Sequence, residues 1–171
     1  FTSDPDAVYA REYTFDLSKI RPVVAKPDFV DNLVPAEEVR GVKIDEAFLG
    51  SCNNGRIEDL RVGASILKGR HVAEKVRFLV VPASQTVYLQ ALKEGLIDTF
   101  IEGGAIVMNP NCSVCWGSCQ GVIGENEVLI STGTRNFKGR AGHPSSKVYL
   151  GSAATVTASA IAGKIATADQ I

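Results

Sequence analysis

Val76-Arg-Phe-Leu-Val-Val-Pro-Ala-Ser84 is the stretch of sequence that most clearly decides the fold. Its first part is apolar apart from Arg77 and rich in β-branched residues, as expected of a strand that is covered on both faces. Pro82 ends this strand because it has no N–H to donate, and Ser84 is a suitable N-cap for a helix. Apolar residues at helical spacing then continue to Gly95. The stretch therefore predicts a strand followed directly by a helix.

The same alternation continues on both sides of this stretch. Upstream, Ala47–Gly50 reads as a short apolar strand, and apolar residues recur at helical spacing from Ile57 to Leu67. Downstream we expect a helix over Leu96–Glu102, strands over Ala105–Met108 and Val128–Ser131, a polar glycine-rich loop and a terminal helix over Ala153–Ile165. Strands and helices that alternate at these lengths predict a three-layer α/β/α domain, with a mostly parallel sheet and helices on both faces.

The first forty residues have a different character. Prolines are spaced along Phe1–Arg40, and each biases the residue before it toward extended geometry. We therefore expect residues 1–40 to form an extended arm with little helix, and residues 41–171 to form the α/β domain. The chain begins with Phe1 rather than Met, so we expect it to be a piece of a longer protein.

Composition limits the classes of function. The 171 residues are 45% hydrophobic and 22% charged, which is ordinary for a globular protein that can bury a core. The formal net charge of −1 favours neither nucleic acid nor an anionic membrane as a partner. No apolar run approaches the roughly 20 residues that span a bilayer. We expect a cytoplasmic protein, in which clustered thiols are more often metal ligands or catalytic groups than disulfides.

Three loops that follow predicted strands hold all four cysteines and most of the unusual polar residues. They are Ser51–Arg56, Asn109–Gln120 and Thr132–His143. In an open parallel sheet, ligands bind at the loops that leave the carboxyl ends of the strands. The sequence therefore predicts one site that is shared by these three loops.

The cysteines in these loops allow three interpretations. Cys112-Ser-Val-Cys115 is a C-x-x-C pair, which could be a redox dithiol, part of a zinc site or part of an iron–sulfur centre. A closed zinc site needs four ligands and would have to recruit Cys119 together with Cys52. Three thiolates, in contrast, suit a cubane cluster with one iron left open to act as a Lewis acid.

Three segments carry a family resemblance. Gly50-Ser-Cys-Asn-Asn-Gly-Arg-Ile-Glu-Asp-Leu-Arg61 resembles the G-S-C-T-N-x-R-x-E-D-L-R segment of 3-isopropylmalate dehydratase and homoaconitase large subunits, in the aconitase superfamily. Asn109-Pro-Asn-Cys-Ser-Val-Cys-Trp-Gly117 is similar to the family's cluster loop, and Thr134-Arg-Asn-Phe-Lys-Gly-Arg140 to its N-R-N-F-x-G-R segment. The segments occur in family order, and the resemblance extends from about Ser3 to the end of the chain.

The resemblance implies a fold of the aconitase iron–sulfur domain type and a set of site residues. Cys52, Cys112 and Cys115 match the cysteines that hold a 4Fe-4S cluster. Arg135 and Arg140 match arginines that help to bind substrate carboxylates, a task that suits a bidentate and permanently charged guanidinium. An alternative is that either arginine is a surface or ion-pair residue. The resemblance implies no catalytic acid or base in this chain.

The sequence departs from the family pattern at two positions. Asn53 stands where the family usually has Thr, and Thr134 stands where it usually has Asn. We hypothesise that these two side chains touch beside the cluster and have exchanged hydrogen-bonding roles, with Asn54 also near the cluster. Cys119 has no family role and is expected to be a small buried side chain. His143 is expected in a solvated loop, with the mouth of the active site as the alternative.

The reaction implied by the resemblance is a dehydration followed by rehydration, which moves a hydroxyl group between neighbouring carbons. The substrate would be a small di- or tricarboxylic acid, in leucine or lysine biosynthesis. The base that removes the carbon-bound proton would come from a small subunit with a swivelling domain. The preceding large-subunit domains are also missing, so the isolated chain is expected to be inactive. The alternative from another class is a non-catalytic domain that binds zinc through four cysteines.

Overall fold

All strands in the described part of the chain belong to one sheet. The structure is a computed structural model and describes residues 2–171. In chain order the strands are β1 (Val23–Ala25), β2 (Leu33–Pro35), β3 (Glu46–Gly50), β4 (Arg77–Val81), β5 (Ile106–Val107), β6 (Val128–Ser131) and β7 (Lys147–Leu150). The helices are α1 (Ser51–Asn54), α2 (Ile57–Leu67), α3 (Gln85–Lys93), α4 (Leu96–Glu102) and α5 (Ala153–Ala162). Short 3₁₀ turns lie at Leu17–Lys19, Ala36–Val39, Ser113–Cys115 and Ala168–Gln170.

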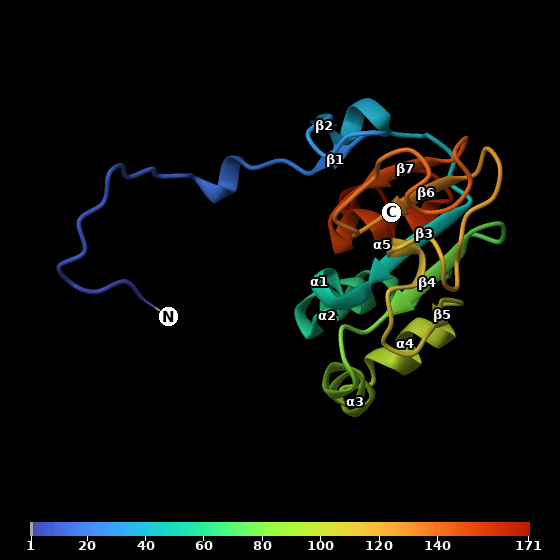
Figure 1. Cartoon of the computed structure of the whole chain (residues 1–171). Helices are drawn as coiled ribbons and strands as arrows, with labels where there is room; N and C mark the ends of the chain where they lie inside the picture. The colour runs from blue at the N-terminus through green and yellow to red at the C-terminus, as the bar shows by residue number, and fades with distance from the viewer. Residues whose placement is uncertain (1) are drawn as a thin grey trace.

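The sheet is mostly parallel, as predicted. Its order is β2-β1-β7-β6-β3-β4-β5, with β7, β6, β3, β4 and β5 parallel and with β1 and β2 antiparallel at one edge (Figure 1). From β3 the chain moves outward through β4 to β5, and it then returns to place β6 on the other side of β3. The point between β3 and β6 is therefore the topological switch, where ligands bind in open α/β sheets.

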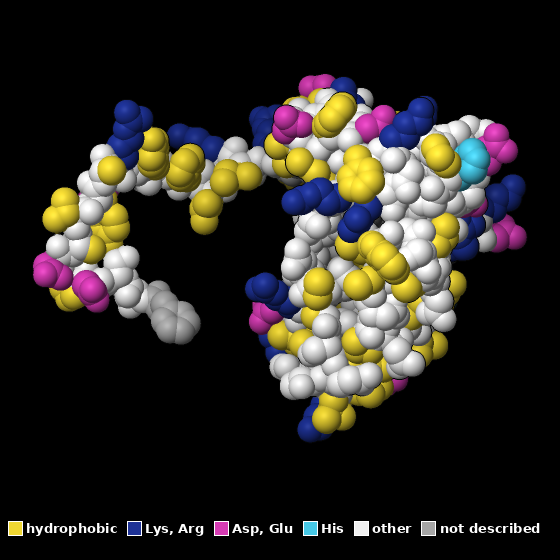
Figure 2. Space-filling view, viewed as in Figure 1, with side chains coloured by type: hydrophobic (Ala, Val, Ile, Leu, Met, Phe, Trp, Pro, Cys, Tyr) yellow, Lys and Arg dark blue, Asp and Glu magenta, His cyan; other side chains and the backbone are white. Residues whose placement is uncertain are grey.

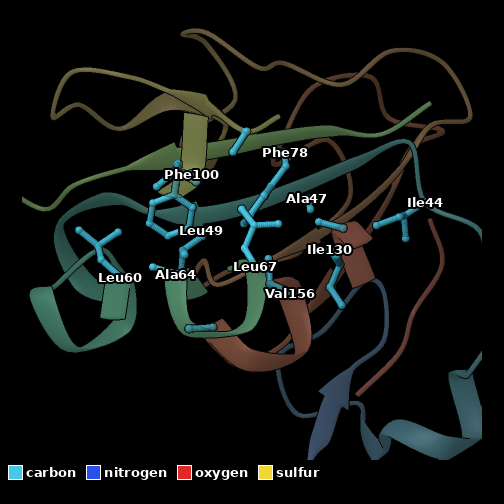
Figure 3. Close-up of a cluster of buried hydrophobic side chains, with 14 of the residues drawn as sticks. Ile44, Ala47, Leu49, Leu60, Ala64, Leu67, Phe78, Phe100, Ile130 and Val156 are labelled. Carbon is cyan, nitrogen blue, oxygen red and sulfur yellow. The ribbon is translucent and has the colours of Figure 1, made fainter. Parts of the chain in front are cut away.

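The long helices pack on one face of the sheet. Leu60, Ala64 and Leu67 of α2 and Val156 of α5 meet the strand residues Ala47, Leu49, Phe78 and Ile130 in one buried cluster (Figure 3). Phe78 also meets Phe100 of α4 edge to face, with ring centroids 6.2 Å apart. Burial of this apolar area is the main favourable contribution to folding. It fixes the strands whose carboxyl ends form the predicted site.

Loops cover the opposite face. A second buried cluster there joins Phe48, Leu79 and Leu129 of the strands to Val114 and Ile123 of the segment between β5 and β6. Within residues 2–171 this face carries the 3₁₀ turn Ser113–Cys115 but no α-helix in its buried cluster. The α/β architecture and the mostly parallel sheet are confirmed, but the second outer layer consists of loops where we expected helices.

The arm projects from the body of the molecule. Residues 2–22 extend away from the sheet, and hydrophobic side chains lie exposed along them (Figures 1 and 2). The later part of the expected arm differs, because β1 and β2 extend the sheet through the pairing of Ala25 with Leu150. The division at residues 40 and 41 stays a prediction, and Phe1 lies outside the described residues. No helix in the described part of the chain is long and apolar enough to cross a membrane.

Candidate metal centre

Cys52 lies in a tight turn at the end of the central strand β3. The strand ends at Gly50 and helix α1 begins at Ser51, so the cysteine emerges at the carboxyl edge of the sheet with its side chain exposed. The turn is bonded to the neighbouring strand. The backbone N–H of Gly50 donates to Thr132 Oγ1 at 3.0 Å, and the side-chain amide of Asn54 donates to the Thr132 carbonyl oxygen. The loop after β6 therefore holds the Cys52 turn in place.

Cys112 and Cys115 share one 3₁₀ turn in the loop between β5 and β6. The N–H of Cys115 donates to the carbonyl oxygen of Cys112 at 3.1 Å. Ser113 between them is fully buried; its N–H donates to Asn111 Oδ1 at 2.5 Å, and its hydroxyl donates to the Gln120 carbonyl oxygen at 2.8 Å. Cys112 is exposed and Cys115 is half-buried. The buried serine thus anchors a turn in which Cys112 is exposed and Cys115 packs against the buried cluster on this face of the sheet.

The cysteine loop and the Cys52 turn both reach the same short segment after β6. A Cβ atom added to Gly133 would lie 3.8 Å from the Cys115 sulfur, so Gly133 lies next to that thiol. The preceding residue, Thr132, is the residue that binds Gly50 and Asn54. Thr132-Gly133 therefore joins the segments that carry Cys52 and Cys115, at the switch point of the sheet.

The arginines lie in the loop that continues from this segment. Arg135 is exposed, and its Nη1 donates to the Thr134 carbonyl oxygen at 2.6 Å. Arg140 is half-buried, with its guanidinium carbon 5.5 Å from the ring centre of Phe137. Neither arginine forms an ion pair with a carboxylate in the described part of the chain. Both positive charges therefore remain available to an anionic ligand.

This arginine loop is packed against the cysteine loop. The backbone of Gly117 lies so close to the Arg140 carbonyl oxygen that no side chain would fit between them. Ile123 continues the contact, because its N–H donates to the Ala141 carbonyl oxygen at 3.0 Å. The structure thus brings the three predicted loops to one side of the molecule.

Several sequence expectations about single residues change. The hydrogen bonds between the loops of Asn53 and Thr134 are made by Asn54 and Thr132, while the Asn53 side chain is exposed. The expectation that Cys119 is buried was wrong, because this residue is exposed. It lines a hollow at the β5 edge of the sheet. His143 is exposed in its loop, as expected, with Nδ1 2.8 Å from Ser145 Oγ.

The donor chemistry fits an iron–sulfur cluster, although the thiols are not gathered into a ready-made site. All four cysteines are free thiols. Within residues 2–171 no three cysteine, histidine or carboxylate side chains lie close enough together to hold a metal ion. Cys52, Cys112 and Cys115 nevertheless follow strands that end at the same edge, on loops that are bonded to each other or in contact. The assignment of these three cysteines as ligands stays a prediction.

Some residues that organise the site were not found from the sequence. Thr132 and Ser113 are uncharged polar residues without a distinctive pattern, so only their buried positions in the fold identify them. Glu46 and Arg77 were also missed, although the sequence offered a clearer signal for them: opposite charges stand at the first positions of two apolar strands. Opposite charges at equivalent positions of neighbouring strands indicate a cross-strand pair.

The fold and site together define a class of protein: a mostly parallel α/β domain whose loops present free thiols and, within residues 2–171, arginines without a carboxylate partner. Comparison with known proteins gives the family. Residues 1–163 match the model of the aconitase family (aconitate hydratase). The chain therefore belongs to the aconitase family.

Individual relatives agree with this assignment. The chain is 51% identical over 99% of its length to a probable methanogen homoaconitase large subunit from Methanothermobacter thermautotrophicus. It is 49% identical over its whole length to a 3-isopropylmalate dehydratase large subunit from a Sulfurihydrogenibium species, and 51% identical over 96% of its length to a 3-isopropylmalate dehydratase large subunit from Archaeoglobus fulgidus. The chain spans 40%, 40% and 39% of the lengths of these three relatives, respectively.

Proposed function

We propose that this chain is the cluster-binding part of the large subunit of a hydro-lyase of the 3-isopropylmalate dehydratase or homoaconitase type. The observation that carries the proposal is the identity of about half of the residues, over nearly the whole chain, to large subunits with these two names. The placement of the matching cysteines and arginines on loops at one edge of the sheet supports it.

In this proposal Cys52, Cys112 and Cys115 hold a 4Fe-4S cluster. A cluster with three protein thiolates supplies an open Lewis-acidic iron, which makes a hydroxyl group a better leaving group. The exposed Cys52 and Cys112 and the half-buried Cys115 can reach a ligand outside the sheet without unfolding the core. Cys119 lines a hollow with residues of β4 and β5, whereas Cys115 lies against Gly133 after β6, so this arrangement favours three thiolates over a zinc site with four.

Arg135 and Arg140 would bind the carboxylates of the substrate. Each offers a charged group that has no carboxylate partner among residues 2–171, and Arg140 also has a buried Nε without a hydrogen-bond acceptor there. A buried N–H without an acceptor is unfavourable, and a bound carboxylate would remove this cost by accepting its hydrogen bond. Thr134, in the loop of the arginines, and Asn54, in the turn that carries Cys52, would lie beside the cluster. The proton of the substrate carbon would go to a group on the small subunit.

A complementation assay tests this function. The full-length large subunit that contains this chain is combined anaerobically with its small subunit and assayed on 3-isopropylmalate and on homocitrate. The proposal expects conversion of one of them, and Arg135→Lys should raise KM for it about tenfold or more because a bidentate contact is lost. An assembled, cluster-loaded pair that converts neither acid would contradict the proposal.

A further inference from the structure

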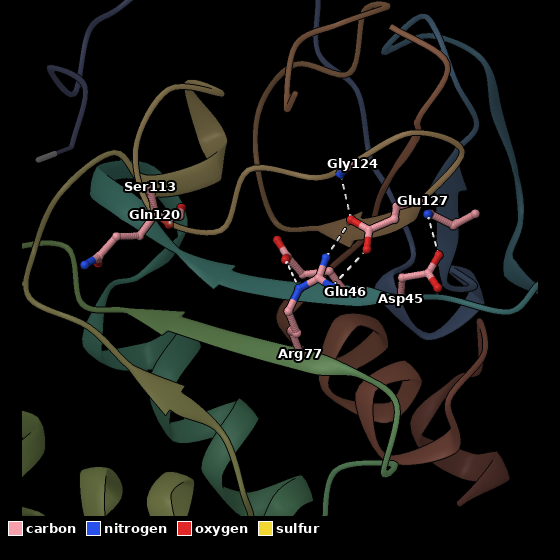
Figure 4. A network of polar contacts seen from close by, with 8 residues as sticks. Asp45, Glu46, Arg77, Ser113, Gln120, Gly124 and Glu127 are labelled. Atoms are coloured by element: carbon pink, nitrogen blue, oxygen red, sulfur yellow. Dashed lines mark hydrogen bonds and ion pairs between the residues drawn. The ribbon is translucent and has the colours of Figure 1, made fainter. Parts of the chain in front are cut away.

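A three-residue ion-pair group lies at the end of the sheet opposite the thiols. Arg77, the first residue of β4, donates from Nε to Glu46 Oε2 at 2.9 Å. Its Nη1 and Nη2 donate to the two carboxylate oxygens of Glu127, at 2.9 and 2.7 Å (Figure 4). A guanidinium that binds a carboxylate through two parallel bonds has both strength and a defined orientation. We name Glu46, Arg77 and Glu127 the latch.

The latch lies beneath residues 120–127, the second half of the segment between β5 and β6. Glu46 is fully buried, and Oε1 is without a hydrogen-bond partner in the described part of the chain. Gly121 lies directly above it: a Cβ atom added there would be 3.4 Å from Glu46 Oε1 and would overlap the side chain of Leu79. We name residues 120–127 the return segment. A buried carboxyl group under this segment is tolerated because Arg77 supplies a charged partner.

Hydrogen bonds connect the latch to the cysteines through the return segment. At one end Glu127 Oε2 accepts a hydrogen bond from the Gly124 N–H at 2.7 Å. At the other end the Gln120 carbonyl oxygen accepts from the hydroxyl of Ser113 at 2.8 Å. Ser113 is fully buried and lies between Cys112 and Cys115 in the sequence, and Figure 4 shows it beside Gln120. A displacement of the return segment would therefore move the turn that carries both thiols.

We propose that Glu46, Arg77 and Glu127 are positioning residues, which set the place of Cys112 and Cys115 by holding the return segment on the sheet. The inference rests on the proposed function only in that these thiols bind the cluster. The attachment of the return segment to the sheet is present in the metal-free chain, because every contact in it is made by protein atoms. Glu127 is its most exposed acidic member and the one that belongs to the return segment.

The test compares Glu127→Gln with Glu94→Gln in the metal-free chain. Glu94 also binds an arginine through two bonds, to Arg61 Nε at 2.8 Å and Nη2 at 2.7 Å, but this pair joins α2 to the end of α3. Glu127→Gln should raise amide hydrogen exchange over residues 113–127 roughly tenfold, because a charge-assisted pair is lost. The labelling rate of Cys115 relative to Cys52, measured by mass spectrometry, should rise by a similar factor. Glu94→Gln should change neither.

A second substitution separates coupling from general loosening. Ser113→Ala removes the hydroxyl that binds Gln120. In the Ser113→Ala background, Glu127→Gln should still increase exchange over residues 121–127, but should change Cys115 labelling by less than about twofold. If Glu127→Gln does not fold, Arg77→Lys serves in its place, since a lysine keeps the charge and cannot bridge both carboxylates.

The proposal is overturned if Glu127→Gln leaves Cys115 labelling unchanged, or if Glu94→Gln increases it equally. It is also overturned if the effect on Cys115 is undiminished by Ser113→Ala. Failure of the proposed function gives a different result: the metal-free chain would show the coupling of the latch to Cys115, but would take up no iron–sulfur cluster on reconstitution.

Discussion

At the scale of single residues, the position of Cys52 depends on how closely its turn approaches the neighbouring strand. Gly50 ends β3 and lies against the backbone of Val81, the last residue of β4, so closely that a Cβ atom would overlap the Val81 carbonyl oxygen. The adjacent backbone of Ser51 has φ 63°. Close approach and an unusual dihedral together send the chain abruptly from strand into helix, which places Cys52 at the sheet edge.

Gly50→Ala should therefore destabilise the protein by about 3 kcal/mol or more in urea unfolding, because the two strands must separate to admit a methyl group. Gly41→Ala is the control. Gly41 also has a positive φ, 87°, but a Cβ atom there would meet nothing within 4 Å. It should cost about 1 kcal/mol. Equal losses in the two variants would show that backbone conformation, rather than the approach to Val81, makes glycine necessary at residue 50.

The buried carboxyl group of Glu46 makes the stability of the protein depend on pH. Its burial raises the pKa of the carboxyl group from 4.5 to about 7, and the hydrogen bond and charge of Arg77 offset only part of this effect. Glu127 nearby adds a small increase through its negative charge. A carboxyl with a raised pKa binds its proton more tightly in the folded chain, so its contribution to stability falls as the pH rises from about 4.5 to about 7.

Glu46→Gln should remove this dependence. The free energy of unfolding of the variant, minus that of the unsubstituted chain, should grow between pH 4.5 and pH 7.5 by at most about 3 kcal/mol. Urea titrations at several pH values measure it. Glu94→Gln should instead be nearly flat over this range, since Arg61 lowers the pKa of Glu94 to about 2 and the stabilising contribution of this carboxylate is lost only as the pH falls from about 4.5 to about 2. A flat difference for Glu46→Gln would mean that this carboxyl does not titrate near neutral pH.

At the scale of elements, the sequence predicted the central strands and the helices well. Helix α2 and strand β6 have the predicted bounds, and Ser84 caps α3 by accepting from the Val87 N–H at 3.2 Å. These elements have local signals: hydrophobic periodicity, caps and breakers. Strand β7 (Lys147–Leu150) was missed, because four residues after a glycine-rich loop are defined only by their pairing with β6.

The outer layer was harder to predict for a similar reason. Periodicity identifies a helix but does not say which face of the sheet it will cover. The loops between β5 and β7 contain glycines and polar residues, yet Val114 and Ile123 in them are buried against the sheet. For the candidate site, the motifs gave the three loops, whereas the bonds from Thr132 to the Cys52 turn depend on the order of strands.

Helix α5 is tied to the chain that follows it by Ser159. Its fully buried hydroxyl donates to the Thr155 carbonyl oxygen at 2.7 Å and accepts from the Ala166 N–H at 3.1 Å. Ser159→Ala leaves that N–H without its side-chain acceptor and should cost about 2 kcal/mol in the free energy of unfolding. Ser65→Ala is the matched control. Ser65 also donates to a helix carbonyl, that of Val62, but is exposed, so its loss should cost less than about 0.5 kcal/mol.

Should the two serine variants unfold at the same denaturant concentration, Ser159 would contribute only its helical bond. The tie to the terminal segment would then be unimportant for stability. A selective loss at Ser159 would instead identify residues 163–171 as part of the folded core, consistent with the burial of Ile165 and Ala166.

At the scale of the whole molecule, the chain combines a packed α/β body with a projecting arm that exposes apolar side chains. The sheet and α2, α4 and α5 enclose one core. On the opposite face, buried loop residues pack against the sheet, and the latch binds the return segment to it. Exposed apolar side chains lie along the projecting arm (Figure 2). Among them are Tyr13, Phe15 and Leu17. The relatives are about two and a half times as long as this chain, since it covers 40% of them. In our account the substrate site is completed by protein outside this chain.

The central claim is that three of the four cysteines hold one 4Fe-4S cluster. Its most direct test is anaerobic reconstitution of the chain with iron and sulfide, followed by absorption spectroscopy and metal analysis. We expect a broad band at about 400 nm and about four irons per chain, lost on Cys52→Ala, Cys112→Ala or Cys115→Ala and retained on Cys119→Ala. A colourless protein that binds one zinc ion and needs Cys119 to do so would contradict the claim.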